Sequence, residues 1–457
     1  MSDAVRRELR AAVRLAAPVV IVQMGLMAMG VIDAMMLGRV SAQALAAGAL
    51  GNVLAIGLQI FAMGILMALD PLVSQADGAG DDIAFARALQ RGLLLAIVLA
   101  VPLSLAMWEM GPLLRLLGQQ EELIVPTAEY IRGLIWGNVP LLVFTVLRQT
   151  LQATSRVRQA LLAIAIGNAV NVPANLALIF GFFGAPRLGV LGSAYATSIS
   201  RWVMAAVILA AGWRVLAPYL RDLRAAVFRL EGYLSMLRLG LPIGVQLSME
   251  FCAFACVALL MGNLGTLELA AHQIAINLAS MAFMVPLGIA GAAATRVGNA
   301  IGRRDPEGAR RAMRVSLALG GAVMLVSASA FALFPSFLAR LYTPETAVVA
   351  LAAQLLPIAA IFQVADGVQA VGSGILRGAA DTRLPAVLMF VGYWLIGIPI
   401  GAGLAFGLGW GPIGLWWALT IGLATVASLL VLRIRHVFGG SLERVEAGSP
   451  MAPDGAA

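Results

Sequence analysis

Residues 14–38 read RLAAPVVIVQMGLMAMGVIDAMMLG, and the stretch from Leu15 to Gly38 carries a single charge, at Asp33. A helix rises 1.5 Å per residue, so about 20 apolar residues cross a hydrocarbon core about 30 Å thick. The stretch therefore predicts a transmembrane helix. It follows four Arg residues and is too long for the core of a cleaved signal peptide, so we expect it to stay in the protein as an anchor.

The rest of the chain has the same character. Of its 457 residues, 61% are hydrophobic and 12% are charged, and the mean hydropathy is +0.92. Soluble proteins average about 45–50% apolar and about 25% charged residues. The net charge is +8, with no Lys, and its Arg residues are scattered between apolar runs. This pattern indicates loops at an anionic membrane face and argues against nucleic-acid binding. With only Cys252 and Cys256, a disulfide framework and a zinc spacing are excluded.

Twelve apolar stretches are long enough to span a membrane, and none has the alternating decamers of a membrane β-barrel. We therefore predict an all-α polytopic membrane protein. The predicted spans are residues 15–38, 45–70, 88–108, 123–146, 159–184, 189–212, 238–262, 268–294, 313–338, 346–375, 384–406 and 411–434.

The distribution of Arg gives the orientation, because cytoplasmic loops collect basic residues. The odd-numbered segments between spans and the C-terminal tail, counted with the span ends beside them, hold 25 of the 31 Arg. The even-numbered loops hold four, at Arg39, Arg115, Arg187 and Arg340. Such a bias requires an even number of spans with both termini in the cytoplasm.

The two halves of the chain resemble each other at an offset of about 224 residues. Pro18 then meets Pro242, Gly64 meets Gly288 and Asp81 meets Asp305. Two copies of six helices that both start in the cytoplasm form parallel repeats, related by a pseudo-two-fold axis along the membrane normal. We predict an N-lobe at 1–212, a charged cytoplasmic linker at 213–236, a C-lobe at 237–436 and a disordered tail at 437–457.

Three carboxylates, Asp33, Glu250 and Asp366, fall inside predicted spans. An ionisable side chain in a span is costly and marks a functional site by default. Arg201 is the one basic residue placed where it could pair with an acid, so the three together leave negative charge for a cation. A carboxyl held protonated by hydrogen bonds between helices is the structural alternative.

Amide side chains accompany these acids. Asn168, Asn171 and Asn175 share one helical face, and Thr197 in the next span could complete their cluster. Gln273 and Asn277 form a comparable face four residues apart. Interhelical hydrogen bonding is the other role open to such residues.

Several motifs together resemble those of the multidrug and toxic compound extrusion (MATE) exporters, in the NorM-like branch. They are MGVID at 29–33 with Gly38 and Arg39, AAHQIA at 270–275, RVGNAIG at 296–302, and GILRG at 374–378 with Asp381 and Thr382. They extend over both halves of the chain. The resemblance implies two lobes around a central cavity and the export of cationic drugs and dyes in exchange for Na⁺ or H⁺. It also implies a monomer among the lipids of a bacterial inner (plasma) membrane.

The resemblance also implies roles for particular residues. Asp33 corresponds to the first-lobe acid, with Asn171, Asn175 and Thr197 around it. Glu250 and Asp366 correspond to the second-lobe cation site, where they would bind Na⁺ or protons, with Gln273 and Asn277 nearby. Some Na⁺-coupled relatives have Tyr where we place Phe283, and Phe keeps the π face without the hydroxyl.

Two other functions fit a chain of this kind. A lipid-linked oligosaccharide flippase of the same superfamily would carry more Arg in its cavity and extra helices. An ion channel, or a membrane enzyme acting on lipids, is the alternative from a different class. The sequence has no Walker motif and no nucleophile–base constellation, so we expect neither an enzyme nor a bound cofactor.

Overall fold

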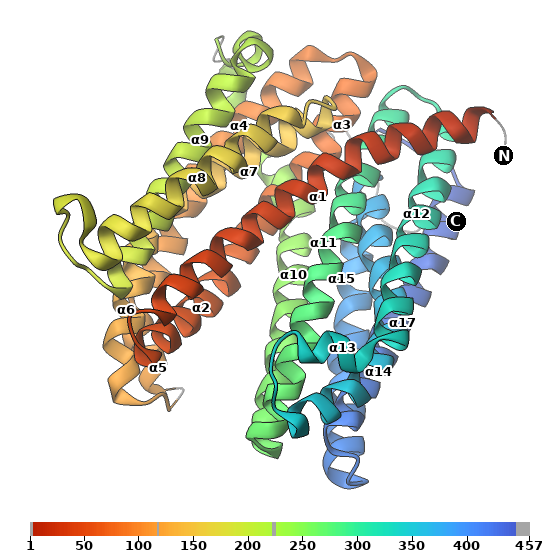
Figure 1. The fold of residues 1–457 in the computed structure, drawn as a ribbon. Helices are drawn as coiled ribbons and strands as arrows, with labels where there is room; N and C mark the ends of the chain where they lie inside the picture. Colours follow the sequence, from red (N-terminus) through yellow and green to blue (C-terminus); the bar gives the residue numbers. More distant parts are fainter. Residues whose placement is uncertain (1–2, 117, 222–224, 445–457) are drawn as a thin grey trace. The chain divides into compact units, whose positions relative to one another are not determined.

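The protein is helical throughout the residues that its structure, a computed structural model, describes, namely 3–116, 118–221 and 225–444 (Figure 1). Eleven helical segments in these ranges are long and apolar enough to cross a membrane, and the bent pair α6–α7 makes a twelfth. This confirms the predicted fold class. The longer helices are α1 (Asp3–Gly38), α2 (Ala42–Leu66), α3 (Leu69–Ala79), α4 (Asp82–Trp108), α6 (Glu121–Ile135), α7 (Asn138–Ala153), α8 (Arg158–Phe180), α9 (Val190–Leu220), α10 (Leu230–Leu264), α11 (Thr266–Gly302), α12 (Pro306–Leu333), α14 (Thr346–Gly378) and α17 (Gly411–Gly439).

The chain divides into two compact units. Their described parts are residues 21–116, 118–221 and 225–244, the N-terminal unit, and residues 3–20 with 245–444, the C-terminal unit. The boundaries between the units fall inside helices α1 and α10. Close backbone approaches within each unit show which part of each helix belongs to it. A Cβ on Gly64 would lie 2.5 Å from Cα of Gly244, so the first part of α10 packs on α2. In the C-terminal unit, a Cβ on Gly288 would lie 2.9 Å from the backbone nitrogen of Val20.

Three spans are interrupted. The break between α2 and α3 precedes Pro71, whose ring nitrogen cannot donate to the preceding helical turn. Helices α6 and α7 meet at 50°. The eleventh span consists of α15 (Arg383–Phe390), η3 (Val391–Gly397), α16 (Ile398–Ala402) and η4 (Gly403–Gly407), and both η segments are π-helical. Such π segments are frequent at functional sites.

The duplication is visible in the backbone of the turns that follow α3 and α11. Gly80 and Arg304, 224 residues apart, both have positive φ angles, of 66° and 57°. The residue after each one is an N-cap: Asp81 accepts a hydrogen bond from the Ala84 amide, and Asp305 accepts one from the Gly308 amide. Short helices, α5 (Met110–Leu116) and α13 (Pro335–Arg340), follow α4 and α12 in the same way.

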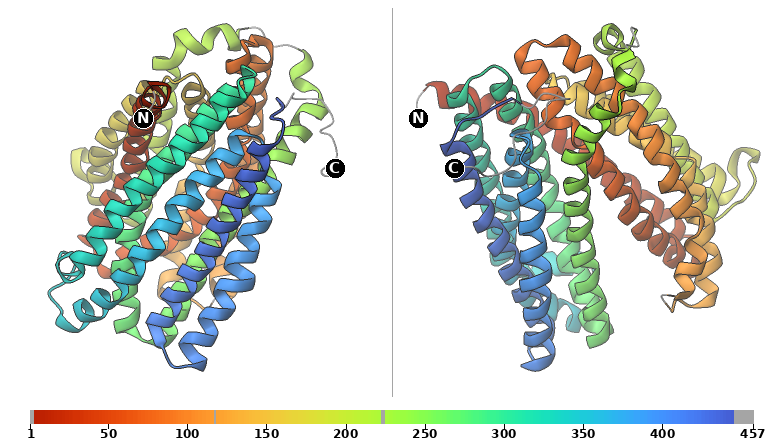
Figure 2. Two further views of the ribbon diagram at one scale, coloured as in Figure 1. Left: turned by 90° about the vertical axis from the view of Figure 1, so that its right-hand side faces the viewer. Right: turned by 180° about the vertical axis from the view of Figure 1, so that it is seen from behind.

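The predicted linker at 213–236 is largely helical (Figure 2). Helix α9 extends to Leu220, and η2 (Ala225–Phe228) leads into α10. In this region Arg91 of α4 is buried and donates from Nη2 to the carbonyl oxygen of Ala226 at 2.7 Å. Residues 222–224 of the linker, and 445–457 of the predicted tail, lie outside the described residues. The lobe limits at 212, 237 and 436 stay predictions from the repeat.

Candidate functional site: buried acids in each unit

Asp33 of α1 lies in a polar cluster inside the N-terminal unit. Its side chain is 5% exposed. Asn175 of α8 donates from Nδ2 to Oδ1 of Asp33 at 2.6 Å, and Thr197 of α9 donates from Oγ1 to Oδ2 at 2.5 Å. Asn175 also donates to Oδ1 of Asn171 at 3.0 Å. The three residues predicted to surround Asp33 are therefore brought to it.

Helical spacing and small residues position this cluster. Asn168, two turns before Asn175, donates to the carbonyl oxygen of Gly25 on α1 at 3.0 Å. A Cβ on Gly25 would overlap the side chain of Ile164, so glycine allows α1 and α8 to approach closely. The Asn face of α8 is thus turned toward α1, which holds Asp33 one turn short of its outer end.

Arg201 lies one turn beyond Thr197 on α9 and interacts electrostatically with Asp33 and with the buried Tyr130. Its Nη2 donates to Oε1 of Gln59 at 3.2 Å. A Cβ on Gly137, at the bend between α6 and α7, would lie 2.9 Å from Cδ of Arg201. Asp33 is therefore not an isolated charge, because the basic residue that the sequence offered as a partner is close to it.

In the C-terminal unit, Glu250 of α10 and Asp366 of α14 interact electrostatically. Asp366 is 4% exposed and Glu250 is half-buried. Gln369, one turn beyond Asp366, is within hydrogen-bonding reach of Glu250. Among the described residues, no ion pair joins either acid to an Arg side chain. Two neighbouring carboxylates in a low-dielectric interior repel each other, so a cation or a proton stabilises the pair.

A continuous series of aromatic rings leads to these acids. His272 of α11 is 5.8 Å from Trp416 of α17, which is 5.8 Å from Phe362 of α14, measured between ring centroids. Phe362 is 6.0 Å from Phe254, which is 5.9 Å from Tyr393. Tyr393 interacts electrostatically with both Glu250 and Asp366. These five rings line the interior of the C-terminal unit next to the acid pair.

The comparisons with known proteins agree with this geometry. The MatE family model matches the chain twice, at residues 18–177 and 242–402, so the second match begins 224 residues after the first. The chain belongs to the MATE family. Because both copies match one model, the duplication inferred from the sequence is a repeat of the MATE unit.

Individual relatives support this assignment and indicate the branch of the family. The MATE chain is 40% identical to the multidrug resistance protein NorM of Burkholderia vietnamiensis, covering 94% of both chains. It is 34% identical to the multidrug resistance protein MdtK of Edwardsiella ictaluri, covering 94% of this chain and 95% of that one. The NorM-like resemblance is confirmed. The eukaryotic MATE transporter AtDTX14 has the same fold, with a TM-score of 0.87 at 24% identity over 94% of this chain and 96% of that one.

Three other predicted site residues of this MATE protein, all on α11, are not fully buried. Gln273 and Asn277 on α11 are exposed, and Phe283 is half-buried. The aromatic ring nearest to Asp366 along its helix is Phe362, one turn earlier. Helical spacing from Asp366 would have identified Phe362 and Gln369. Tyr393 has no such signal, because only the packing of the π segment brings it to the acids.

The polar groups of the acid pair suit either coupling ion of a MATE transporter. Within the described ranges, no three His, Cys, Asp or Glu side chains gather as a metal site. Na⁺ can instead use carboxylate and amide oxygens. Oε1 of Gln369 is buried and has no hydrogen-bond partner, so it is available as such a ligand beside Glu250 and Asp366.

Proposed function

We propose that the protein is a multidrug antiporter that exports amphipathic organic cations, drugs and dyes among them, in exchange for Na⁺ or H⁺. Family membership and the multidrug-resistance relatives support this proposal. The observation that carries it is the pair of acids in the C-terminal unit, Glu250 and Asp366, which interact with each other and have no Arg partner in the described structure.

The acid pair would couple the two fluxes by competition. An empty pair carries negative charge that attracts a cation. When Na⁺ or a proton from outside neutralises Glu250 and Asp366, that attraction is lost and a cationic substrate is released. Substrate and coupling ion then favour opposite states of the same transporter, as alternating access requires.

Asp33 would have a related role under different control. Hydrogen bonds from Asn175 and Thr197 stabilise its ionised form, and Arg201 offsets part of its charge. A cation or proton that displaces this arrangement must compete with donors already in place. We therefore expect transport to depend less on the charge of Asp33 than on the charges of Glu250 and Asp366.

We further propose that the protein acts as a monomer in the bacterial inner (plasma) membrane with both termini in the cytoplasm. The excess of Arg in the odd-numbered segments supports this orientation. The bacterial relatives support the location.

Reconstitution in liposomes tests the function and identifies the ion. We expect a fluorescent organic cation to move in the direction opposite to Na⁺ or H⁺ when a gradient of that ion is imposed. The gradient that drives this movement identifies the coupling ion. Glu250→Gln and Asp366→Asn should reduce this exchange to background while the protein remains folded in the membrane. Glu129→Gln, which changes an exposed carboxylate of α6, is the matched control and should retain exchange.

Full exchange by either acid variant would refute the assignment of the acid pair. Ion current without counter-transport in the wild-type protein would identify a channel instead.

A further inference from the structure

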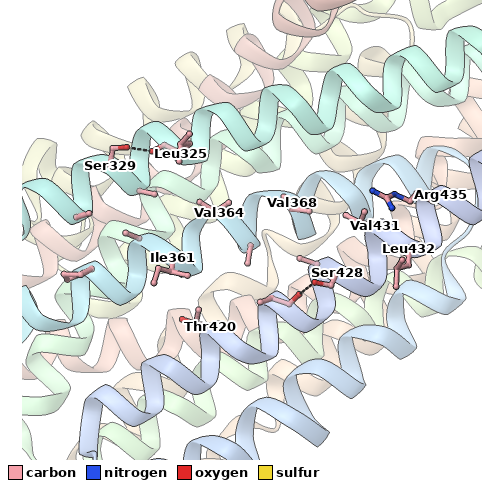
Figure 3. Close-up of a pocket in the computed structure, with 17 residues that line it drawn as sticks. Leu325, Ser329, Ile361, Val364, Val368, Thr420, Ser428, Val431, Leu432 and Arg435 are labelled. Atoms are coloured by element: carbon pink, nitrogen blue, oxygen red, sulfur yellow. Dashed lines mark hydrogen bonds between the residues drawn. The ribbon is translucent and has the colours of Figure 1, made fainter.

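A long groove runs along the outer surface of the C-terminal unit between α12, α14 and α17 (Figure 3). Its volume is about 1070 Å³, just above the roughly 300–1,000 Å³ of ligand pockets. Ile361, Val364 and Val368 of α14 form its floor, while α12 and α17 flank it.

The groove presents almost only hydrocarbon. Its three hydroxyl groups are each hydrogen-bonded within their own helix: Ser329 to the Leu325 carbonyl at 2.8 Å, Thr420 to the Trp416 carbonyl at 2.8 Å, and Ser428 to the Ala424 carbonyl at 2.7 Å. Large apolar side chains remain open to the surroundings, with Leu325 60% exposed and Leu432 59% exposed. A ligand of this groove must therefore be apolar along most of its length.

One end of the groove is charged. Arg435, near the end of α17, is the one charged residue that lines it, and its side chain is exposed. In the described structure Arg435 forms no hydrogen bond or ion pair. Nearby Arg side chains are engaged instead: Arg433 pairs with Asp381 at 2.6 Å, and Arg310 donates to the Phe438 carbonyl at 2.8 Å.

The dimensions match one leaflet of a bilayer. From Thr420 to Arg435 the helix rises about 22 Å, close to half of the roughly 40–45 Å that a bilayer measures with its headgroups. The charged end lies where the Arg distribution predicts the cytoplasmic face, and the cytoplasmic leaflet is the one with anionic lipids. A chain lying in the groove would thus place its headgroup phosphate at the level of Arg435.

We propose that the groove between α12, α14 and α17 binds an acyl chain of an anionic phospholipid of the cytoplasmic leaflet, with the lipid phosphate on Arg435. The site is separate from the buried acids and does not depend on the transport assignment. Apolar contact selects the acyl chain, and the unpaired guanidinium selects the anionic headgroup.

Photocrosslinking in vesicles tests the site on the full-length protein. Phosphatidylglycerol and phosphatidylcholine, each carrying a diazirine in one acyl chain, are compared by peptide mapping. We expect label on groove residues of α14 and α17, stronger for phosphatidylglycerol by about five-fold, the factor for one Arg near an anionic surface. Arg435→Gln should lower phosphatidylglycerol labelling to the phosphatidylcholine level.

Two further variants make the result specific. Arg314→Gln removes another exposed Arg of this unit, outside the groove, and should leave labelling unchanged. Ala424→Phe fills the groove at an exposed position and should reduce labelling by both lipids. Equal labelling by the two lipids, equal effects of Arg435→Gln and Arg314→Gln, or undiminished labelling of Ala424→Phe would overturn the proposal. Thermal unfolding of each variant verifies that it is folded.

Discussion

Three side chains of the aromatic series that leads to the acid pair have buried polar atoms without partners. Nδ1 of His272, Nε1 of Trp416 and the hydroxyl of Tyr393 are all buried and have no hydrogen-bond partner among the described residues. Leaving such a group unsatisfied costs about 1–3 kcal/mol. Of the three, the Tyr393 hydroxyl is the one that interacts with both carboxylates, so it is available to an incoming ion or its water.

Tyr393→Phe tests this at the residue closest in function to the acids. Removing the hydroxyl should raise the ion concentration for half-maximal export by about ten-fold. This factor corresponds to the free energy of one hydrogen bond to a charged group. The maximal rate and thermal stability should stay near wild type, because the ring remains. Export is measured in liposomes as a function of Na⁺ or pH. Tyr342→Phe, in an outer turn, is the control, and an equal shift in both variants would contradict the role of Tyr393.

At the scale of elements, the two copies of the repeat use the same turn with different residues. The turn after α3 has Gly80 at its left-handed position, and the turn after α11 has Arg304 there. In both turns, the backbone amide of the following residue donates a hydrogen bond to a carbonyl oxygen of the last helical turn. Asp81 donates to Ala76 at 3.0 Å, and Asp305 donates to Ala300 at 2.9 Å. Only glycine adopts a positive φ without steric strain, so the second copy is the strained one.

Exchanging these residues should therefore have opposite effects. Gly80→Ala should destabilise the protein and Arg304→Gly should stabilise it, each by about 1 kcal/mol, because a side chain in the left-handed region costs about 1–2 kcal/mol. Both positions are exposed, and a Cβ at Gly80 meets no neighbour. Thermal unfolding in detergent measures the change. Arg303→Gly, at an ordinary helical φ, should not stabilise, and a gain there as large as that of Arg304→Gly would contradict the argument.

Local patterns predict elements better than they predict how elements bend and meet. Hydropathy was sufficient for the spans, and helical spacing grouped Asn171 and Asn175 on one face, whereas the family resemblance was needed to place them around Asp33. The break at Pro71 was readable in principle, whereas the π turns that carry Tyr393 depend on packing between distant helices. Gln273 and Asn277 show the limit of a helical face: the pattern groups two side chains but does not say which way they point.

At the scale of the molecule, the C-terminal unit includes the first residues of the chain. Glu8 of α1 is held by Arg296 of α11, which donates to its two carboxylate oxygens from Nε at 2.9 Å and from Nη2 at 2.6 Å. Both side chains are largely buried, at 12% and 24% exposure. A two-bond contact of this kind fixes geometry as well as contributing energy.

A charge exchange tests this contact. Glu8→Arg or Arg296→Glu alone should destabilise the protein by about 1–3 kcal/mol, since each places like charges together in a partly buried site. The double variant should recover most of the loss in thermal unfolding. Arg115→Glu, beside Glu121, is a control at an exposed ion pair and should have a smaller effect. Additive losses in the double variant would show that the pair contributes nothing.

The position of Glu8 also has a consequence for biosynthesis. Its partner is 288 residues further along the chain, and at about 5–20 residues per second a ribosome needs roughly 15–60 s to make that interval. For this time the first turns of α1, which precede the predicted span at 15–38, lack the surface that they will finally cover. The start of α1 therefore stays without its partner until Arg296 has been made, and during this interval chaperones and proteases can reach it.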